Sequence, residues 1–324
     1  MHCVLSSDNP MTSSAASTLS RSQRRVAAAG GRHIGDIVGW NTERINVSRE
    51  NARKLLEPEK FEHLIVDMDP ATALSRAAGE VKRPANILVR PFSRPNVDTP
   101  ASFGVYLQNK NDGEKGDSVV CGARCRVDSG GNRIVSLPPE GGAGLEAALA
   151  HAENIAAHAN HLITHCETRD ISNVLVAMVK ALSGVPIRNR GGLYLLPPPS
   201  CGTWKRLKPA LEELRVEPLT IEMHDAPDNL AVAKSAAQSA LESDIAELLT
   251  DLEKAKTDGM RQDALTRRVQ FCNELVAKAE LYRGVLAGVS DKITTKVKEL
   301  QDSFQRQLSG GGSSGPSFSI AVND

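Results

Sequence analysis

Aromatic residues are scarce in this chain, at 3% of its 324 residues. Phenylalanine, tyrosine and tryptophan therefore cannot fill a large core, and burial must come from aliphatic side chains. Apolar residues make up 40% of the sequence, with a heavy share of alanine. Because alanine and leucine are among the best helix formers, this composition favours a protein rich in helices.

An excess of charge of one sign is also missing. The sequence holds 39 Lys and Arg residues against 39 Asp and Glu residues, which gives a formal net charge of zero. Such a balance excludes a general electrostatic attraction to nucleic acid, so contact with nucleic acid would need a local basic patch. No segment approaches the roughly 20 consecutive apolar residues that span a bilayer, and we expect no membrane partner.

The common catalytic motifs are absent. The sequence contains no phosphate-binding Gly-x-x-x-x-Gly-Lys-Ser/Thr, no Gly-x-Ser-x-Gly and no Cys-x-x-Cys. Six cysteines are scattered through a chain that is long enough to fold without disulfides, and free thiols in the cytoplasm are the simplest interpretation. We therefore expect no cofactor, and the absence of motifs argues against an enzyme.

The two ends of the chain have tail-like compositions. Residues 1–32 are rich in Ser, Ala and Arg, with Asp8 as the only acid, which predicts a disordered tail. The same composition also resembles an organelle transit peptide, and either Met1 or Met11 could be the start. Residues 309–324 begin with a Ser/Gly run typical of a flexible tail.

Between the tails, the pattern predicts a globular α+β region at 33–224, with a sub-boundary at the Gly/Pro-rich segment 138–144. Strands are expected at 34–40, 193–196 and 219–223, and helices at 48–56, 70–79, 145–166, 171–182 and 203–214. β-rich runs at 87–89, 103–107, 119–127 and 134–135 are separated by short turn clusters. Because parallel neighbours would need a crossover of a dozen or more residues, these four runs predict an antiparallel meander.

The strongest periodic signal lies in residues 225–308, where apolar residues recur at steps of three and four. A turn at Thr257–Gly259 divides the pattern into helices at 228–257 and 260–308, which predicts a long antiparallel helical hairpin or coiled coil. Gly284 and Gly288 should weaken the second helix and mark a bend or a close crossing. Since the second helix overhangs the first, its distal stripe should bind the globular part, a partner protein or a second copy of the chain. The residues of this predicted oligomer interface are Val289, Ile293, Val297, Leu300 and Phe304.

Histidines gather in the helix expected at 145–166. His151, His158, His161 and His165 fall within an arc of about 80° of the helix surface. The spacing of His158, His161 and His165 is compatible with metal coordination by neutral imidazoles. The alternative is that all four form the solvated face of an amphipathic helix, because aliphatic residues occupy the opposite arc.

Two carboxylates, Asp67 and Asp69, stand just before Pro70. They could present oxygen ligands to a magnesium ion in nucleotidyl or phosphoryl chemistry, which makes them candidate catalytic residues. A strand end that leads into a capped helix explains them equally well.

Two basic stretches stand out against the neutral total, at 76–94 and 188–208. The second combines cations with aromatic rings, a mixture that suits the phosphates and bases of a single-stranded nucleic acid. An ordinary solvated edge with core aromatics is the alternative. The candidate nucleic-acid-binding residues of this stretch are Arg188, Arg190, Tyr194, Trp204, Lys205, Arg206 and Lys208.

Three segments carry a family resemblance: 182–188 (LSGVPIR), 191–197 (GGLYLLP) and 278–286 (KAELYRGVL). Together with the helical pattern that follows, they resemble an uncharacterised family of phage and bacterial mobile-element proteins over roughly residues 145–305. The resemblance implies a bacterial cytoplasm or a phage-infected cell, and it implies no reaction, cofactor or catalytic residue.

The sequence thus favours a non-enzymatic interaction or oligomerisation protein that contacts nucleic acid. A metal-dependent enzyme acting on nucleic acid or nucleotides, with Asp67, Asp69 or the histidines at its centre, is one alternative. A phage structural component is another.

Overall fold

A computed structural model describes residues 31–93, 101–109, 118–139, 145–188, 192–286 and 288–310. These residues form two compact units. The unit called here the meander unit comprises Trp40–Leu182 and Thr203–Pro218, and the bundle unit comprises Ser183–Gly202 and the described residues up to Gly39 and from Leu219 on. Antiparallel strand pairs stand beside helices, and the C-terminal part of the chain is helical, which confirms the α+β class.

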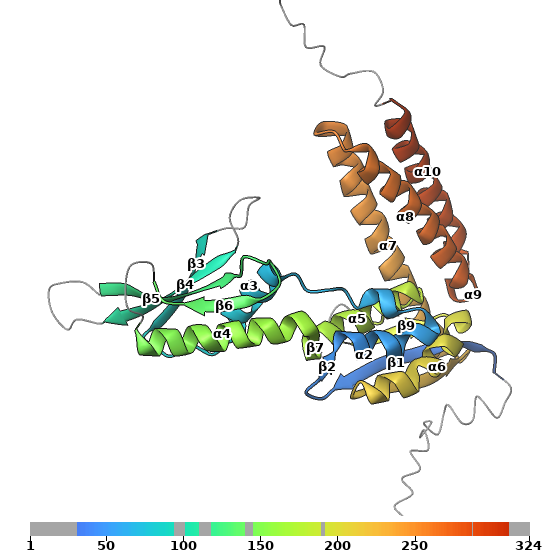
Figure 1. The fold of residues 1–324 in the computed structure, drawn as a ribbon. Coiled ribbons are helices and arrows are strands. Elements are labelled where there is room, and N and C mark those ends of the chain that lie inside the picture. Colours follow the sequence, from blue (N-terminus) through green and yellow to red (C-terminus); the bar gives the residue numbers. More distant parts are fainter. Residues whose placement is uncertain are drawn as a thin grey trace, which may run out of the picture. The chain divides into compact units, whose positions relative to one another are not determined.

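The meander unit contains the predicted four-stranded sheet (Figure 1). Its strands are β3 (Ile87–Ser93), β4 (Ser102–Asn109), β5 (Ser118–Val127) and β6 (Ile134–Leu137). They lie in the order β3-β4-β5-β6, and every neighbouring pair is antiparallel. The turn between β5 and β6 is closed by the Asp128 carboxylate, which accepts hydrogen bonds from the backbone N–H groups of Asn132 and Arg133 at 2.9 and 3.2 Å.

Helices α3 (Pro70–Glu80) and α4 (Glu146–Thr164) cover one face of this sheet. Alanines on both helices are fully buried, which lets the helix backbones approach the strands closely. The Asn160 side chain fixes α4 to β6, because it accepts from the backbone N–H of Ile134 and donates to the carbonyl of the same residue, each at 2.8 Å. The sheet therefore has a covered inner face and an opposite outer face.

The remaining elements of the meander unit are α2 (Arg49–Leu56), short 3-10 turns at Glu57–Glu59 and Glu62–Leu64, α5 (Thr168–Ala181), and the small sheet of β2 (Asn46–Ser48) and β7 (His165–Glu167). Helix α6 (Pro198–Glu213) joins this unit from Thr203 on. The predicted cap at Ser48 is present, since its hydroxyl accepts from the Asn51 N–H.

A second sheet has most of its residues in the bundle unit. This sheet has the order β10-β1-β9-β8, formed by β10 (Val216–His224), β1 (His33–Thr42), β9 (Leu193–Leu196) and β8 (Val185–Pro186). Asp36 lies opposite Leu196, and Gly39 lies opposite Leu193. Buried residues of these strands share one apolar core with the C-terminal helices.

The C-terminal helices are α7 (Pro227–Thr257), α8 (Gln262–Leu281), the single turn α9 (Arg283–Leu286) and α10 (Val289–Gly310). Ion pairs fix the antiparallel register of α7 and α8, with Lys278 at 3.0 Å from Asp244 and Arg268 at 2.7 Å from Asp251. Helix α10 then runs back along both of them (Figure 1).

The predicted antiparallel hairpin is therefore present in α7 and α8, but the prediction that its second arm is one helix at 260–308 is wrong. The chain reverses between Tyr282 and Gly288, where Gly288 has a φ of +50° that favours glycine. A heptad pattern gives the spacing of a buried stripe but not the point at which the chain turns back, so it does not distinguish two successive helices from one long helix.

The reversal also covers the predicted oligomer interface. Ile293, Val297, Leu300 and Phe304 are 0–5% exposed because α10 packs against α7 and α8, and Val289 packs partly buried at the same core. The stripe is thus the buried face of α10 in a three-helix bundle. Helices α7 and α8 of the same chain cover it, where a partner was expected.

Several predicted boundaries fall at or beyond the edge of the described residues. The predicted tail 1–32 with Met1 and Met11, the sub-boundary 138–144 and the tail 309–324 lie largely outside them. The predicted division at 224 differs from the observed one, because the C-terminal helices form one unit with β1, β8 and β9. Among the helices of the described ranges, none has both the length and the apolarity needed to cross a bilayer.

Candidate nucleic-acid interface

The outer face of the four-stranded sheet brings together cations from separate strands. Residues paired across antiparallel strands point to the same side, and Arg90, Gly104 and Arg124 form one row across β3, β4 and β5. Arg126 lies two residues further along β5, on the same side. Cys125, between the two β5 arginines, points to the opposite side and is fully buried against α4.

This face carries no opposing acid within its strands. Inside the bounds of the four strands there is no Asp or Glu, whereas Arg90 and Arg126 are exposed and Arg124 is partly exposed. A patch of one sign therefore exists locally in a chain whose total charge is zero. Such a patch attracts an anionic partner at short range.

Two aromatic rings lie among these arginines. Phe92 is 48% exposed, and the guanidinium carbon of Arg124 lies 3.8 Å from the centre of its ring. Tyr106 lies over Gly104, since a Cβ built on that glycine would come within 2.6 Å of the ring. Gly104 thus makes room for the tyrosine ring to lie against the strand, and Tyr106 is partly exposed.

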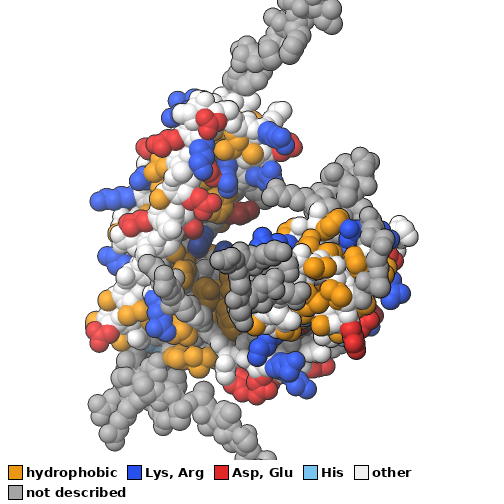
Figure 2. Space-filling view, turned by 90° about the vertical axis from the view of Figure 1, so that its left-hand side faces the viewer, with side chains coloured by type: hydrophobic (Ala, Val, Ile, Leu, Met, Phe, Trp, Pro, Cys, Tyr) orange, Lys and Arg blue, Asp and Glu red, His pale blue; other side chains and the backbone are white. Residues whose placement is uncertain are grey.

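Hydrophobic side chains extend the same surface. Val119 at the start of β5 is 49% exposed on the outer face, where Leu88 and Leu137 are partly exposed. A space-filling view from the side of the meander shows hydrophobic side chains gathered there with Lys and Arg side chains among them (Figure 2). The outer face therefore offers both apolar platforms and positive charge.

The predicted nucleic-acid-binding stretch at 188–208 is less suitable. Trp204 is fully buried and packs against Trp40 with ring centroids 6.3 Å apart, so it cannot stack on a base. The guanidinium of Arg206 donates to both oxygens of Glu59 at 2.7 and 2.9 Å.

The other members of that stretch are dispersed. Lys208 lies 3.7 Å from Glu212, Lys205 and Arg188 are exposed, and Tyr194 is partly buried, while Arg190 lies outside the described residues. Arg188 and Tyr194 belong to the bundle unit, whereas the residues from Trp204 on belong to the meander unit.

Asp67 and Asp69 do come together at one cleft of about 430 Å³, which Arg49 and Cys166 also line. Both carboxylates have structural partners there. Asp67 pairs with Arg53, and this hydrogen bond lowers the pKa of Asp67. Asp69 is the N-cap of α3, where its Oδ1 accepts from the Thr72 N–H at 3.0 Å and its pKa is lowered by that bond. The helix-cap interpretation accounts for Asp69 without a metal.

The histidines of α4 and β7 separate rather than converge. His161 bonds to Asn46 at 2.9 Å and stacks on His165 at 4.3 Å, whereas His158 lies 3.2 Å from the Glu80 carboxylate. Burial and the neighbouring His165 lower the pKa of His161. His151, expected on the solvated face, is instead 4% exposed, and burial lowers its pKa. The helix is less regularly amphipathic than its histidine spacing indicates, because alanines and a histidine share its covered side.

Oxygen and nitrogen atoms of Glu80, His158 and Glu167 lie within 4.8 Å of one another, a spacing that could hold a metal ion. Arg76 already neutralises this group, however, with contacts of 2.9 Å to Glu80 and 3.2 Å to Glu167. Burial would raise the pKa of Glu80, but hydrogen bonds from His158 and Arg76 outweigh it and lower that pKa. The cluster is therefore best described as an ion-pair network that joins α3, α4 and β7.

Sequence reasoning missed the outer face because its residues are far apart in the chain. The sequence does hold one signal of this surface. Arg90 and Phe92 are two residues apart in one strand, Arg124 and Arg126 are two residues apart in another, and neither strand contains an acid. Only the strand register shows that they share one side.

Comparison with known proteins adds the family. Residues 33–310 match the model of a family of unknown function, DUF6744, which extends well beyond the resemblance at 145–305. No curated protein and no solved structure matches the chain. The matched residues make up most of the sequence, and the chain therefore belongs to the family of unknown function DUF6744.

Proposed function

We propose that this protein binds single-stranded nucleic acid on the outer face of its four-stranded sheet and does so without catalysing a reaction. The observation that carries the proposal is the row of Arg90 and Arg124 beside Phe92 and Tyr106 on strands that contain no acid. Arginines neutralise phosphates, and aromatic rings stack on bases whatever their sequence.

The scaffold suits such a surface. Open faces of helix-backed antiparallel sheets bind single-stranded RNA in known modules through exposed aromatic side chains. The strand order here is a simple meander, so the likeness to these modules lies in the kind of surface and not in a shared fold. A duplex fits less well, because stacking requires bases that are splayed out of a helix.

The resemblance to phage and mobile-element proteins supports a bacterial cytoplasm as the setting, where single strands are exposed during replication and transfer. Oligomerisation remains a separate proposal, since the stripe expected to mediate it is covered by the chain itself. Light scattering of the full chain tests it directly, with a dimeric or larger mass as the supporting result.

Binding is tested with fluorescence anisotropy on a labelled oligonucleotide of about 12 nucleotides, within the usual site size for sheet surfaces. The triple variant Arg90→Gln, Arg124→Gln, Arg126→Gln is compared with the triple variant Lys292→Gln, Lys296→Gln, Lys298→Gln, which removes the same charge from the exposed side of α10. Three lost phosphate contacts should lower the slope of log K against log salt by about 2, at about 0.7 per contact for single strands.

The stacking component is tested separately from the charges. Tyr106→Ala should weaken binding by about 5- to 150-fold, whereas Tyr106→Phe should keep it, because stacking needs the ring and not the hydroxyl. Equal affinities for the sheet variant and the α10 variant, or no binding by the wild type, would contradict the proposal.

A further inference from the structure

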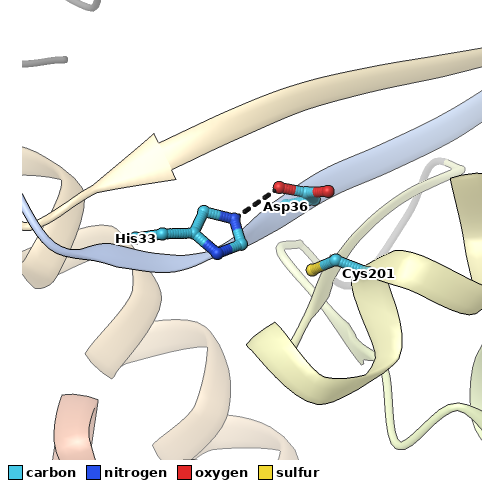
Figure 3. A group of neighbouring side chains, drawn as sticks. All are labelled: His33, Asp36 and Cys201. Carbon is cyan, nitrogen blue, oxygen red and sulfur yellow. Dashed lines mark hydrogen bonds and ion pairs between the residues drawn. The ribbon is translucent and has the colours of Figure 1, made fainter.

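The bundle unit contains a group of side chains that the proposed function does not use. His33, Asp36 and Cys201 lie at the point where β1, the end of β9 and the start of α6 meet, with one ligand atom of each within 4.8 Å of the others (Figure 3). The His33 Nε2 lies 2.7 Å from the Asp36 Oδ1. Asp36 is fully buried and Cys201 is 3% exposed.

The backbone of β1 is shaped to bring the first two together. In a regular strand, residues three apart point to opposite faces, so His33 and Asp36 should not meet. Gly35 interrupts the alternation with a φ of +143°, and a Cβ at this position would lie 2.4 Å from the Leu196 carbonyl oxygen. Only glycine fits there, and the irregularity puts the imidazole and the carboxylate side by side.

A second histidine lies next to this group. The rings of His33 and His224 are 6.0 Å apart and packed edge to face. The Nδ1 of His224 lies 3.1 Å from the carbonyl oxygen of Gly31, and because a carbonyl only accepts, Nδ1 carries the hydrogen. In the neutral ring, Nε2 is then a free acceptor, and it is buried without a hydrogen-bond partner among the described residues. An imidazole held by a backbone carbonyl at one nitrogen, with the other nitrogen open, is the usual state of a metal-binding histidine.

We propose that His33, Asp36 and Cys201 form a site for a zinc ion, with His224 as the fourth ligand. Thiolate, imidazole and carboxylate together are the ligands of tetrahedral zinc. With metal–ligand bonds of about 2.0 to 2.3 Å, ligand atoms in such a site lie about 3.3 to 3.8 Å apart, so the atoms of His33, Asp36 and Cys201, which lie within 4.8 Å of one another, need only small side-chain rotations to reach this spacing.

The charges of the ligands suit a divalent ion. A zinc ion would offset the negative charges of the Asp36 carboxylate, which is fully buried, and of the Cys201 thiolate. On binding, the zinc–sulfur bond replaces the S–H bond of Cys201 and that proton passes to solvent, while the neutral His33 ring keeps its one hydrogen on Nδ1 and binds zinc through Nε2.

The bound ion would join β1, β10 and the start of α6, which come from distant parts of the sequence. A link of this kind has a structural role, because it stabilises the folded state by binding only when the three elements are assembled. The site is also independent of the sheet surface proposed to bind nucleic acid, since its residues belong to the bundle unit.

The test uses the full chain, stripped with a chelator and then incubated with Zn²⁺ or Co²⁺ alone. Elemental analysis after gel filtration should give one zinc per chain, and zinc should raise the melting temperature by about 4 °C or more. The Co²⁺ form should show an intense thiolate-to-cobalt charge-transfer band. Cys201→Ala should abolish this band, and His33→Gln and Asp36→Asn should each weaken zinc binding at least about tenfold.

Two variants serve as matched controls. Cys121→Ala removes a half-buried thiol elsewhere, and His158→Gln removes the imidazole of the Glu80 group, so both should bind zinc as the wild type does. Less than one zinc per chain, a charge-transfer band that survives Cys201→Ala, or zinc lost in His158→Gln would each overturn the proposal. The Co²⁺ spectrum of the wild type decides the question even if a variant fails to fold.

Discussion

The hydroxyl of Tyr282 offers the sharpest test of how the C-terminal bundle is anchored. Tyr282 is 1% exposed at the point where α8 ends, and its hydroxyl lies 2.9 Å from the carbonyl oxygen of Ser183 and 2.8 Å from that of Leu195. The single hydroxyl hydrogen lies between the carbonyl of Ser183, two residues before β8, and that of Leu195 in β9, so Tyr282 links the reversal of the bundle to these two segments. Burial raises the pKa of Tyr282 well above its usual value, which keeps the hydroxyl a donor.

Tyr282→Phe removes this donor and leaves buried acceptors behind. The loss should cost about 1–3 kcal/mol of unfolding free energy, the range for a buried group deprived of its partner. Urea unfolding followed by the helical circular dichroism measures it, with Tyr106→Phe, on the outer face of the sheet, as a matched control expected within about 0.5 kcal/mol of wild type.

Tryptophan fluorescence gives an internal reference in the same titration. Both tryptophans of the chain, Trp40 and Trp204, lie in the meander unit, so their signal reports on the unit that lacks Tyr282. We expect the helical transition to move to lower urea and the fluorescence transition to move less. A helical midpoint unchanged by Tyr282→Phe would refute the anchoring role.

Three further changes test the packing of each unit. Arg49→Lys should lower the free energy of unfolding by about 2–4 kcal/mol, measured by fluorescence in urea. The buried guanidinium of Arg49 donates to the carbonyls of Leu162, Ile163 and Val66, and a lysine cannot make all of these hydrogen bonds. A variant as stable as the wild type would contradict this role of Arg49. The pKa of Glu80 is lowered in the fold from its ordinary value of 4.5, so its contribution to stability is present above that pH and is lost as the pH falls through the folded pKa. Fluorescence-monitored melting between neutral and acid pH should show this loss, and Glu80→Gln should flatten it. Phe304→Ala should lower the free energy of unfolding of the bundle by about 3–5 kcal/mol and leave the mass measured by light scattering unchanged. A change in mass would support the hypothesis that Phe304 lies in an oligomer interface.

The local elements were predictable because their signals are local. Turn clusters between short β-rich runs defined the meander, and the cap at Ser48 appears as expected. The apolar period marked α7 from about residue 228 to its end at Thr257. In each case, the residues that determine the structure lie within a few positions of one another.

The errors arise where the chain folds back on itself. The sequence predicts that the apolar stripe through Val297 and Phe304 is exposed, because the apolar period does not show that the chain reverses between Tyr282 and Gly288. A glycine such as Gly288 predicts a weak point in a helix, but a bend and a full reversal of the chain have the same sequence signature. Whether a surface stripe is covered depends on tertiary contacts.

The candidate sites were missed for a related reason. Arg90 and Arg124 become neighbours only through the register of three strands, and His33 meets Asp36 only because Gly35 breaks the strand alternation. Conversely, the prominent cluster around Trp204 and Arg206 is occupied by packing and by an ion pair. Composition indicates which residue types are available, but the fold decides which are free to bind.

Photo-crosslinking of the full chain to a single-stranded oligonucleotide that carries photoreactive bases tests the main proposal most directly. Mass spectrometry of the digested complex should find the crosslinks on Phe92 and Tyr106, in β3 and β4. Crosslinks concentrated between Arg188 and Lys208, or none above the level seen with a duplex, would contradict the assignment of the outer face as the binding surface.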